Sequence, residues 1–254
     1  MARFDNKAVL VTGAASGFGE AIARRFASEG ARVLCADIDE KKGPEVVQSI
    51  MASGAEAHFV KADVSSSDDV KNMVDTCHER YGAIDILVNN AGYAHLSMLM
   101  WKIEEKVFED VFDVNVKGVF LGCKFAIPYM IEQGGGVIIN TASVGAVAPR
   151  AGLTPYNATK GAVMTMTKGL ALEVARHNIR CNAVNPVAAD TAFMKGAMGV
   201  DQLDNEQKSA LTSTVPRGRL AEPKDVAAAV CFLASDDADL ITGTCLNVDG
   251  GRSI

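Results

Sequence analysis

A tyrosine and a lysine stand four positions apart in the stretch TPYNATKG, as Tyr156 and Lys160. The stretch opens a predicted long helix, so residues at i and i+4 share one face of it. A free tyrosine has a pKa near 10, too high for a base at neutral pH, but a nearby cation lowers the pKa of a phenol. The pair therefore predicts acid–base chemistry, with a half-buried aromatic beside a solvated amine as the structural alternative.

Three glycines, Gly13, Gly17 and Gly19, follow the first predicted strand and open the first predicted helix. A tight turn and close backbone approach to a pyrophosphate both need residues without a Cβ. A helix N-terminus adds free N–H groups that bind phosphates. Because the glycines have this strand–turn–helix context, they predict a dinucleotide site rather than a glycine-rich turn without a ligand.

Asp37 ends the second predicted strand, 18 residues after Gly19. A carboxylate at such a position accepts hydrogen bonds from the adenosine ribose and repels a 2′-phosphate. No arginine or lysine occurs in GAASG or directly after Asp37. The pattern therefore favours NAD over NADP, with a solvent-facing aspartate at a strand end as the alternative.

The composition excludes several classes of function. The 254 residues carry a net charge of −6, which argues against a nucleic-acid binder, since such a protein needs a basic face. No apolar run reaches the roughly 20 residues that span a bilayer, and MARFDNKAVLVTG runs into a strand without signal-peptide architecture. The six cysteines have no CxxC spacing and indicate buried thiols in a reducing compartment. We expect a cytoplasmic protein with no metal, membrane or nucleic-acid partner.

Seven apolar runs typical of buried parallel strands alternate with stretches of helical spacing. The runs are KAVLVT, RVLCAD, AHFVKA, IDILVN, GVIINT, IRCNAVN and CLNVD. Two of the helical stretches end at Gly30 and Gly82, because glycine favours a helix stop. The alternation predicts an α/β fold, a single doubly wound domain over residues 1–254 with helices on both faces of a parallel sheet. Residues 187–214 lack a predicted strand, and we expect this long irregular stretch to be a substrate-binding lid.

Several motifs occur together in the order and spacing of one family. They are TGAASGFG, ADV at 62–64, NNAG at 89–92, Asn115, Ser143, the Tyr156 and Lys160 pair, and ITGTCLNVDGG near the end. On these motifs the whole chain resembles the short-chain dehydrogenase/reductase family. The resemblance implies a seven-stranded parallel Rossmann sheet and assembly as a homotetramer. The stretches AASGFG, GLTPYNATKG and NVDGGRSI are similar to members acting on aromatic alcohols and aldehydes, including sulfonated benzyl compounds.

The resemblance also implies which residues bind NAD. Asp63 and Val64 would contact the adenine, and residues 186–191 would flank the nicotinamide. Val187 replaces a glycine common in the family, and we expect it to affect substrate choice more than cofactor binding. The full implied set is Gly13, Ser16, Gly17, Phe18, Gly19, Asp37, Ile38, Asp63, Val64, Asn89, Ala91, Gly92, Tyr156, Lys160, Pro186, Val187 and Thr191.

Four residues are catalytic by the same resemblance: Asn115, Ser143, Tyr156 and Lys160. Hydride transfer from an alcohol to a nicotinamide leaves a proton to be removed, and Tyr156 would be the general acid/base that handles it. Ser143 would hydrogen-bond the substrate oxygen, and Lys160 would also reach the nicotinamide ribose. Asn115 would bind a water beside Lys160 in a proton relay.

The expected function is an NAD(H)-dependent alcohol dehydrogenase or carbonyl reductase for a small molecule. Phe193, Met194 and Met198 in the lid suggest a partly apolar or aromatic substrate. Two alternatives remain. An NADPH-dependent 3-oxoacyl-carrier-protein reductase shares nearly every motif, but Asp37 and the net acidity disfavour it. A dinucleotide-binding sensor or scaffold without turnover is disfavoured by the complete catalytic set.

Two further residues near these motifs are open to interpretation. His95 follows the NNAG stretch and is a candidate for contact with the substrate. Arg150 precedes the Tyr156 helix and is a candidate for attracting an anionic substrate. For Arg150, a solvated or interface arginine is the preferred interpretation.

Overall fold

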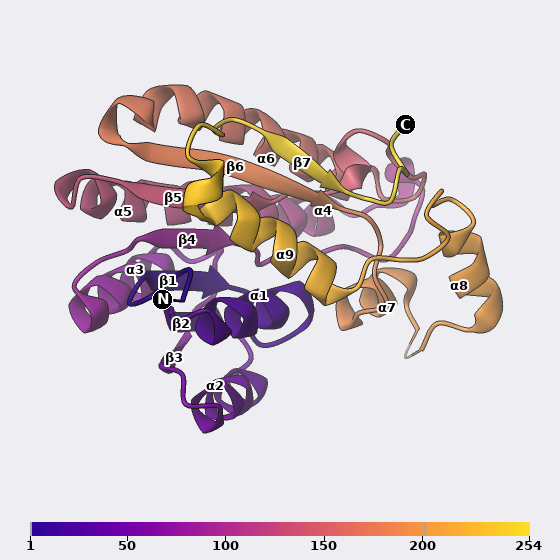
Figure 1. Cartoon of the computed structure of the whole chain (residues 1–254). Helices are drawn as coiled ribbons and strands as arrows, with labels where there is room; N and C mark the ends of the chain where they lie inside the picture. The colour runs from indigo at the N-terminus through magenta and orange to yellow at the C-terminus, as the bar shows by residue number, and fades with distance from the viewer. Residues whose placement is uncertain (1, 201) are drawn as a thin grey trace.

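A seven-stranded parallel sheet forms the centre of the molecule (Figure 1), in a computed structural model that describes residues 2–200 and 202–254. The strand order is β3-β2-β1-β4-β5-β6-β7, so the direction of winding reverses between β1 and β4. All seven predicted runs form strands, and the predicted doubly wound Rossmann arrangement is confirmed. The strands are β1 Ala8–Thr12, β2 Arg32–Asp37, β3 Ala57–Lys61, β4 Ile86–Asn89, β5 Gly136–Thr141, β6 Ile179–Pro186 and β7 Cys245–Val248.

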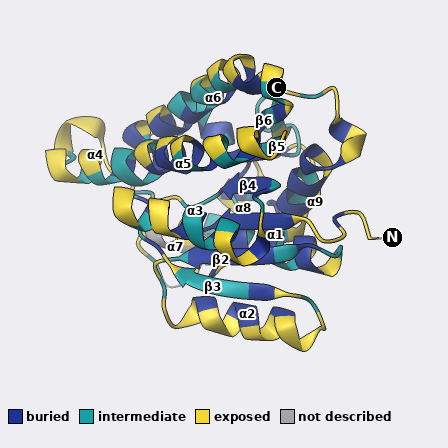
Figure 2. Ribbon diagram, turned by 90° about the vertical axis from the view of Figure 1, so that its left-hand side faces the viewer, coloured by how far each residue is buried: buried dark blue, intermediate teal, exposed yellow. Residues whose placement is uncertain are grey.

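Helices cover both faces of this sheet (Figure 1). One face carries α1 (Gly17–Ser28), α2 (Lys42–Ala52) and α9 (Pro223–Ala234), whose apolar residues share a core with β1 and β2. The other carries α3 (Ser67–Tyr81), α5 (Gly118–Glu132) and α6 (Thr154–Val174), with α4 (Glu105–Phe112) beside α6. Burial is deepest on the central strands, while α4 and the outer side of α2 are exposed (Figure 2).

Two glycines end helices where the sequence predicts, and a serine side chain caps the start of α3. The Ser66 hydroxyl accepts a hydrogen bond from the Asp69 N–H and caps the start of α3. Gly82 ends α3 at φ +74°, the left-handed conformation that favours glycine. Gly30 follows the end of α1 at φ +92°. The two glycines therefore mark where the chain leaves α1 for β2 and α3 for β4.

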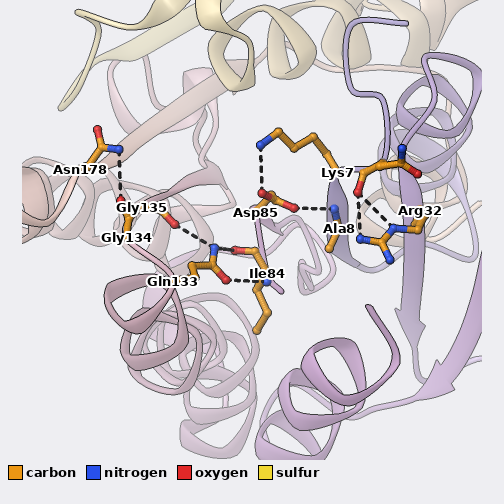
Figure 3. A network of polar contacts seen from close by, with 10 residues as sticks. Lys7, Ala8, Arg32, Ile84, Asp85, Gln133, Gly134, Gly135 and Asn178 are labelled. Carbon is orange, nitrogen blue, oxygen red and sulfur yellow. Dashed lines mark hydrogen bonds and ion pairs between the residues drawn. The ribbon is translucent and has the colours of Figure 1, made fainter. Parts of the chain in front are cut away.

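Side-chain hydrogen bonds tie the strands together at the amino-terminal edge of the sheet (Figure 3). The Asp85 carboxylate accepts from the Ala8 N–H at 2.8 Å and from the Lys7 ammonium at 3.1 Å. The Gln133 side chain bonds both the N–H and the carbonyl of Ile84, at 3.0 Å and 2.9 Å. Because the opposite, carboxyl edge lies beyond these contacts, its loops are left to form a site.

The predicted lid contains two short helices, α7 (Ala192–Met198) and α8 (Asn205–Thr212), beyond the carboxyl ends of the strands (Figure 1). The prediction of a long irregular stretch was therefore wrong for these segments. A capping box starts α8, in which the Asp204 side chain and the Gln207 side chain each bond the other residue's N–H. Lys208 of α8 pairs with Asp190 at 2.9 Å, which ties α8 to the segment after β6.

Helices α4 and α5 join through a π-helical segment, η2 (Asp113–Lys117), into one run over residues 105–132. By length and composition alone this run could cross a membrane. Its buried residues include Val119, Gly122 and Ala126, which pack toward the sheet. Asn115 within η2 is fully buried. The α5 part of the run therefore packs on the core of the domain while α4 is exposed, and a π segment between two such helices often marks a functional site.

Candidate active site

A cavity of about 670 Å³ opens at the carboxyl edge of the sheet. Its walls come from the β1–α1 turn, the end of β2, the loops after β4, β5 and β6, and helices α6 and α7. Doubly wound folds bind ligands at this edge, beside the point where the strand order reverses. The fold therefore provides a dinucleotide-sized hollow in the place that the sequence predicts.

The three glycines of the β1–α1 turn are required for different reasons. A Cβ on Gly13 would lie 2.8 Å from the Ala91 Cα, and one on Gly19 would lie 1.9 Å from the Gly13 carbonyl oxygen. Both glycines are therefore needed by the protein's own packing. A Cβ on Gly17, at φ +58°, would meet only Thr191, at 3.8 Å. Gly17 is thus the glycine that leaves the start of α1 open to a phosphate.

The Asp37 carboxylate is fixed at the cavity wall by two backbone N–H groups. One oxygen accepts from Ala15 at 2.8 Å and the other from Asp39 at 2.9 Å. Lys61 lies opposite Asp37 on β3, and its ammonium pairs with Glu40 at 2.9 Å. The charge that this wall presents is therefore negative, as the sequence predicts. Other residues of the implied NAD set line the same cavity: Ser16, Phe18, Ile38, Asp63 and Val64.

The loop after β4 uses its two asparagines differently. The Thr12 hydroxyl accepts from the N–H groups of Asn90 and Ala91, at 2.9 Å and 3.0 Å, and holds the loop against the glycine turn. Asn90 lines the cavity, whereas Asn89 is buried in the core and donates to the Asn140 side chain at 2.9 Å. The structure therefore gives Asn89 a structural contact in place of the predicted cavity contact. Sequence reasoning missed Asn90 and Thr12, although both belong to quoted motifs.

Asn115 lies just behind the cavity wall. Its amide donates to the Tyr93 carbonyl at 2.9 Å and to the Thr159 hydroxyl at 3.0 Å, and its oxygen accepts from the Tyr93 N–H at 2.8 Å. A Cβ on Gly92 would lie 3.3 Å from the Asn115 oxygen and 3.6 Å from the Lys160 ammonium. The oxygen and the ammonium therefore converge on Gly92, and Asn115 also fixes the Tyr93 loop against α6.

Ser143, Tyr156 and Lys160 meet in the cavity. Ser143 follows β5; its hydroxyl oxygen accepts from the Gly145 N–H at 3.0 Å, and its proton is directed to the Tyr156 hydroxyl. The Lys160 ammonium lies 5.7 Å from the centre of the Tyr156 ring and donates to the Thr141 carbonyl at 2.8 Å. The spacing of the pair on α6 thus places both side chains on the cavity side, as predicted.

The electrostatics of Tyr156 differ from the prediction. Burial raises the pKa of the Tyr156 phenol to about 12, and a hydrogen bond from Ser143 offsets part of that rise. Burial also lowers the pKa of the Lys160 ammonium to about 8. The predicted lowering of the Tyr156 pKa by the lysine cation is thus wrong for this geometry, because desolvation of the phenolate dominates and the offsetting hydrogen bond comes from Ser143 rather than from Lys160. The Tyr156 phenol is therefore protonated at neutral pH.

Apolar side chains form the wall near Tyr156. The ring of Phe193 from α7 lies 5.7 Å from the Tyr156 ring, and Leu96, Leu153 and Met194 line the same cavity. Met198 does not line it. The predicted apolar surface is therefore present, with Leu96 and Leu153 added to it.

The structure settles where His95 points. Its ring is buried and does not line the cavity, although the neighbours Ala94 and Leu96 do. The Nδ1 atom hydrogen-bonds the Leu96 carbonyl at 2.7 Å. His95 therefore supports the loop rather than contacting a substrate in this conformation.

Val187 occupies the position after Pro186 at the end of β6. Its side chain is buried at the cavity wall and packs with Val144, Val215 and Ala221. Its N–H donates to the Val248 carbonyl at 3.1 Å. A side chain here therefore braces the turn after Ser143, which is how it would shape the nicotinamide end of the site.

Comparison with known proteins identifies relatives along the whole chain. A profile described as enoyl-(acyl carrier protein) reductase matches residues 13–253. A 4-formylbenzenesulfonate dehydrogenase of Comamonas testosteroni is 44% identical over 250 residues, which are 98% of this chain and 99% of that protein. A 3-oxoacyl-[acyl-carrier-protein] reductase of Thermotoga maritima is 36% identical over 252 residues, 99% of this chain and 100% of that protein. The predicted similarity to sulfobenzyl dehydrogenases is confirmed.

A solved structure has the same fold over its full length. It is a 3-ketoacyl-(acyl-carrier-protein) reductase from Brucella melitensis complexed with NADH. The TM-score is 0.92 at 42% identity, over 99% of this chain and 100% of that one. A nicotinamide dinucleotide is therefore bound by a protein of this architecture.

Proposed function

The chain belongs to the short-chain dehydrogenase/reductase family, and on that premise we propose that it interconverts an alcohol and a ketone or aldehyde with NAD(H). The observation that carries the proposal is the meeting of Ser143, Tyr156 and Lys160 in the cavity that the glycine turn also lines. When bound, the dinucleotide supplies the hydride acceptor for oxidation or the hydride donor for reduction. The relative that acts on 4-formylbenzenesulfonate supports an aromatic aldehyde or alcohol as the substrate.

The chain's own residues handle the proton and the orientation of the substrate. In the reductive direction Tyr156 donates its proton to the carbonyl oxygen, which becomes the alcohol. In oxidation the Tyr156 phenolate accepts the alcohol's proton. Ser143 donates a hydrogen bond to the same substrate oxygen, because its own oxygen is already held by Gly145. Lys160 supplies a positive charge beside the phenol, and Phe193 and Leu153 give the reacting carbon an apolar wall.

We further propose NAD rather than NADP, on the negative wall at Asp37. Replacing Asp37 with serine removes the charge that repels a 2′-phosphate and the acceptor for the ribose. Loss of hydrogen bonds to a charged group costs about 1.5–3 kcal/mol, so kcat/KM for NAD should fall by about 10- to 100-fold. The kcat/KM for NADP should rise. Initial rates with each dinucleotide give the ratio of kcat/KM for NAD to kcat/KM for NADP.

Asp37→Asn is the matched control for this substitution, because it keeps the size of the side chain and one acceptor oxygen for Ala15. It should relax the preference less than Asp37→Ser does. A wild-type enzyme with equal rates on both dinucleotides, or a preference unchanged in Asp37→Ser, would refute the assignment of Asp37.

A second candidate function is reduction of a 3-oxoacyl group on a carrier protein, which the Thermotoga and Brucella relatives favour. The Brucella protein is complexed with NADH, so a preference for NAD does not separate the two candidates. The two candidate functions differ in the substrate, because only the second requires an acyl thioester. Faster reduction of acetoacetyl thioesters than of aryl aldehydes would favour the second candidate.

We propose a homotetramer in the cytoplasm as the working form. Exposed apolar side chains gather on the segment that leads through η1 (Met100–Lys102) and α4 into α5, namely Leu99, Met100, Trp101, Phe108 and Phe120. The α4 side of the molecule is exposed in Figure 2. Large apolar patches of this kind usually mark protein interfaces. Six free thiols, five of them buried, support a reducing compartment.

Light scattering after size exclusion tests the oligomeric state. The expected mass is four times that of the chain, and Phe120→Glu should lower it, because a buried unpaired carboxylate weakens an interface. A wild-type monomer at micromolar concentration would contradict the proposal.

A further inference from the structure

Arg150 is the one cationic side chain besides Lys160 among the described residues that line the cavity. It lies in the loop between β5 and α6, six residues before Tyr156. Its guanidinium is half-buried, and Nη2 donates to the Thr214 hydroxyl at 3.0 Å, in the segment after α8. Its carbonyl accepts from the Asn157 side chain at 3.0 Å, which fixes the backbone beside α6. The guanidinium is therefore held at the wall rather than free in solvent.

A second arginine reinforces the positive charge there. Arg252, in the C-terminal segment, lies near enough for its charge to add to the lowering of the Arg150 pKa that burial causes. The Arg252 Nε atom is buried and has no hydrogen-bond partner within the described part of the chain. The charge of Arg252 therefore adds to the electrostatic cost of holding the Arg150 guanidinium at the cavity wall, a cost that a bound anion would relieve.

The acidic side chains of this region are engaged elsewhere. The Asp249 carboxylate accepts from the N–H groups of Gly251 and Ser253 and from the Ser253 hydroxyl. Asp190 pairs with Lys208. Within residues 2–200 and 202–254, no carboxylate forms an ion pair with Arg150 or Arg252. In a chain of net charge −6, an uncompensated arginine pair beside a cavity indicates a site for an external anion.

We infer that Arg150, supported by Arg252, binds the sulfonate or carboxylate of an anionic aromatic substrate whose carbonyl or hydroxyl group reacts at Tyr156. This inference rests on the proposed function, since it names the substrate class of the same site. The apolar wall of Phe193, Leu153 and Met194 takes the ring, and the guanidinium takes the charged substituent at the far end. An arginine suits this role because its donors match the oxygens of a sulfonate or carboxylate. We infer this role in place of the interpretation preferred from sequence, a solvated or interface arginine.

The test compares 4-formylbenzenesulfonate and 4-formylbenzoate with neutral benzaldehyde. In wild type, kcat/KM with NADH should be higher for the two anionic aldehydes. In Arg150→Met the ratio of anionic to neutral values should fall by about 10- to 100-fold, the loss expected for hydrogen bonds to a charged group. Arg150→Lys should retain part of the preference for the anionic aldehydes. Arg217→Met is the matched control, because Arg217 is an exposed arginine nearby that does not line the cavity.

A binding measurement tests the inference without requiring turnover. Calorimetry measures 4-formylbenzenesulfonate binding to wild type, Arg150→Met and Arg217→Met, each loaded with NAD, and melting curves check that the variants are folded. Affinity lost in Arg150→Met alone supports the anion site, even if neither aldehyde is reduced and the proposed function fails. Equal affinity in all three proteins, or an unchanged ratio in Arg150→Met while benzaldehyde is reduced, overturns the inference and leaves the proposed function standing.

Discussion

Tyr156→Phe should lower kcat/KM in both directions by about 10²- to 10⁴-fold, the usual contribution of a general acid or base. The substitution removes one hydroxyl from a partly buried ring and keeps the packing against Phe193. Dinucleotide binding and thermal stability should therefore change little. Initial rates measured at 340 nm give the activity, and calorimetry of NAD binding shows that the site is intact.

The pH dependence of the reaction rates shows whether Tyr156→Phe loses activity because a proton donor is gone or because the site is distorted. Because burial raises the Tyr156 pKa to about 12, the phenolate fraction increases about tenfold per pH unit below that value. Alcohol oxidation by wild type should therefore accelerate between pH 6 and pH 7, where Lys160 is still largely charged, while aldehyde reduction should stay level. Tyr156→Phe should lose this slope. A variant with wild-type rates would contradict the catalytic role and favour a binding protein without turnover.

Lys160→Met should also lower kcat/KM by about 10²-fold or more, because it removes the positive charge beside the phenol. Methionine has a similar length, so the buried volume is nearly kept. Unlike Tyr156→Phe, this variant should also bind NAD more weakly, because we expect the ammonium to reach the nicotinamide ribose. Parallel measurements of rate and of NAD affinity separate the two roles.

Stability gives an independent check on the charge of Lys160. Burial lowers its pKa from the usual 10.5 to about 8. Between pH 8 and pH 10.5, Lys160 is therefore protonated in the unfolded chain but deprotonated in the folded protein. The free energy of unfolding of wild type should therefore rise relative to that of Lys160→Met as the pH increases from 8 to 10.5. Urea titrations at several pH values measure this difference. A constant difference would show that Lys160 is not desolvated as the structure indicates.

The parts of the fold that the sequence predicts well are those governed by local periodicity. Buried parallel strands are continuous apolar runs, and left-handed glycines such as Gly82 end helices for backbone reasons alone. The i, i+4 spacing of Tyr156 and Lys160 likewise depends only on the helix. These features need no knowledge of distant contacts.

Other features depend on which way a side chain faces or on contacts far along the chain. Asn89 and Asn90 are neighbours in one motif, yet one bonds Asn140 in the core and the other lines the cavity. The meeting of Arg150 with Thr214 joins residues 64 positions apart. The phenol's pKa follows from its burial, which spacing does not reveal. The start of α8 was predictable, since Asp204 and Gln207 have the spacing of a capping box.

The most direct test of the central claim is an absorbance assay at 340 nm on the wild-type protein. Benzyl alcohol, its 4-sulfonated and 4-carboxylated derivatives and a secondary alcohol are each offered with NAD and with NADP at alkaline pH. We predict a rise in absorbance with NAD on the aryl alcohols and a much slower one with NADP. Turnover that prefers NADP, or NAD binding without turnover on any of these substrates, would contradict it.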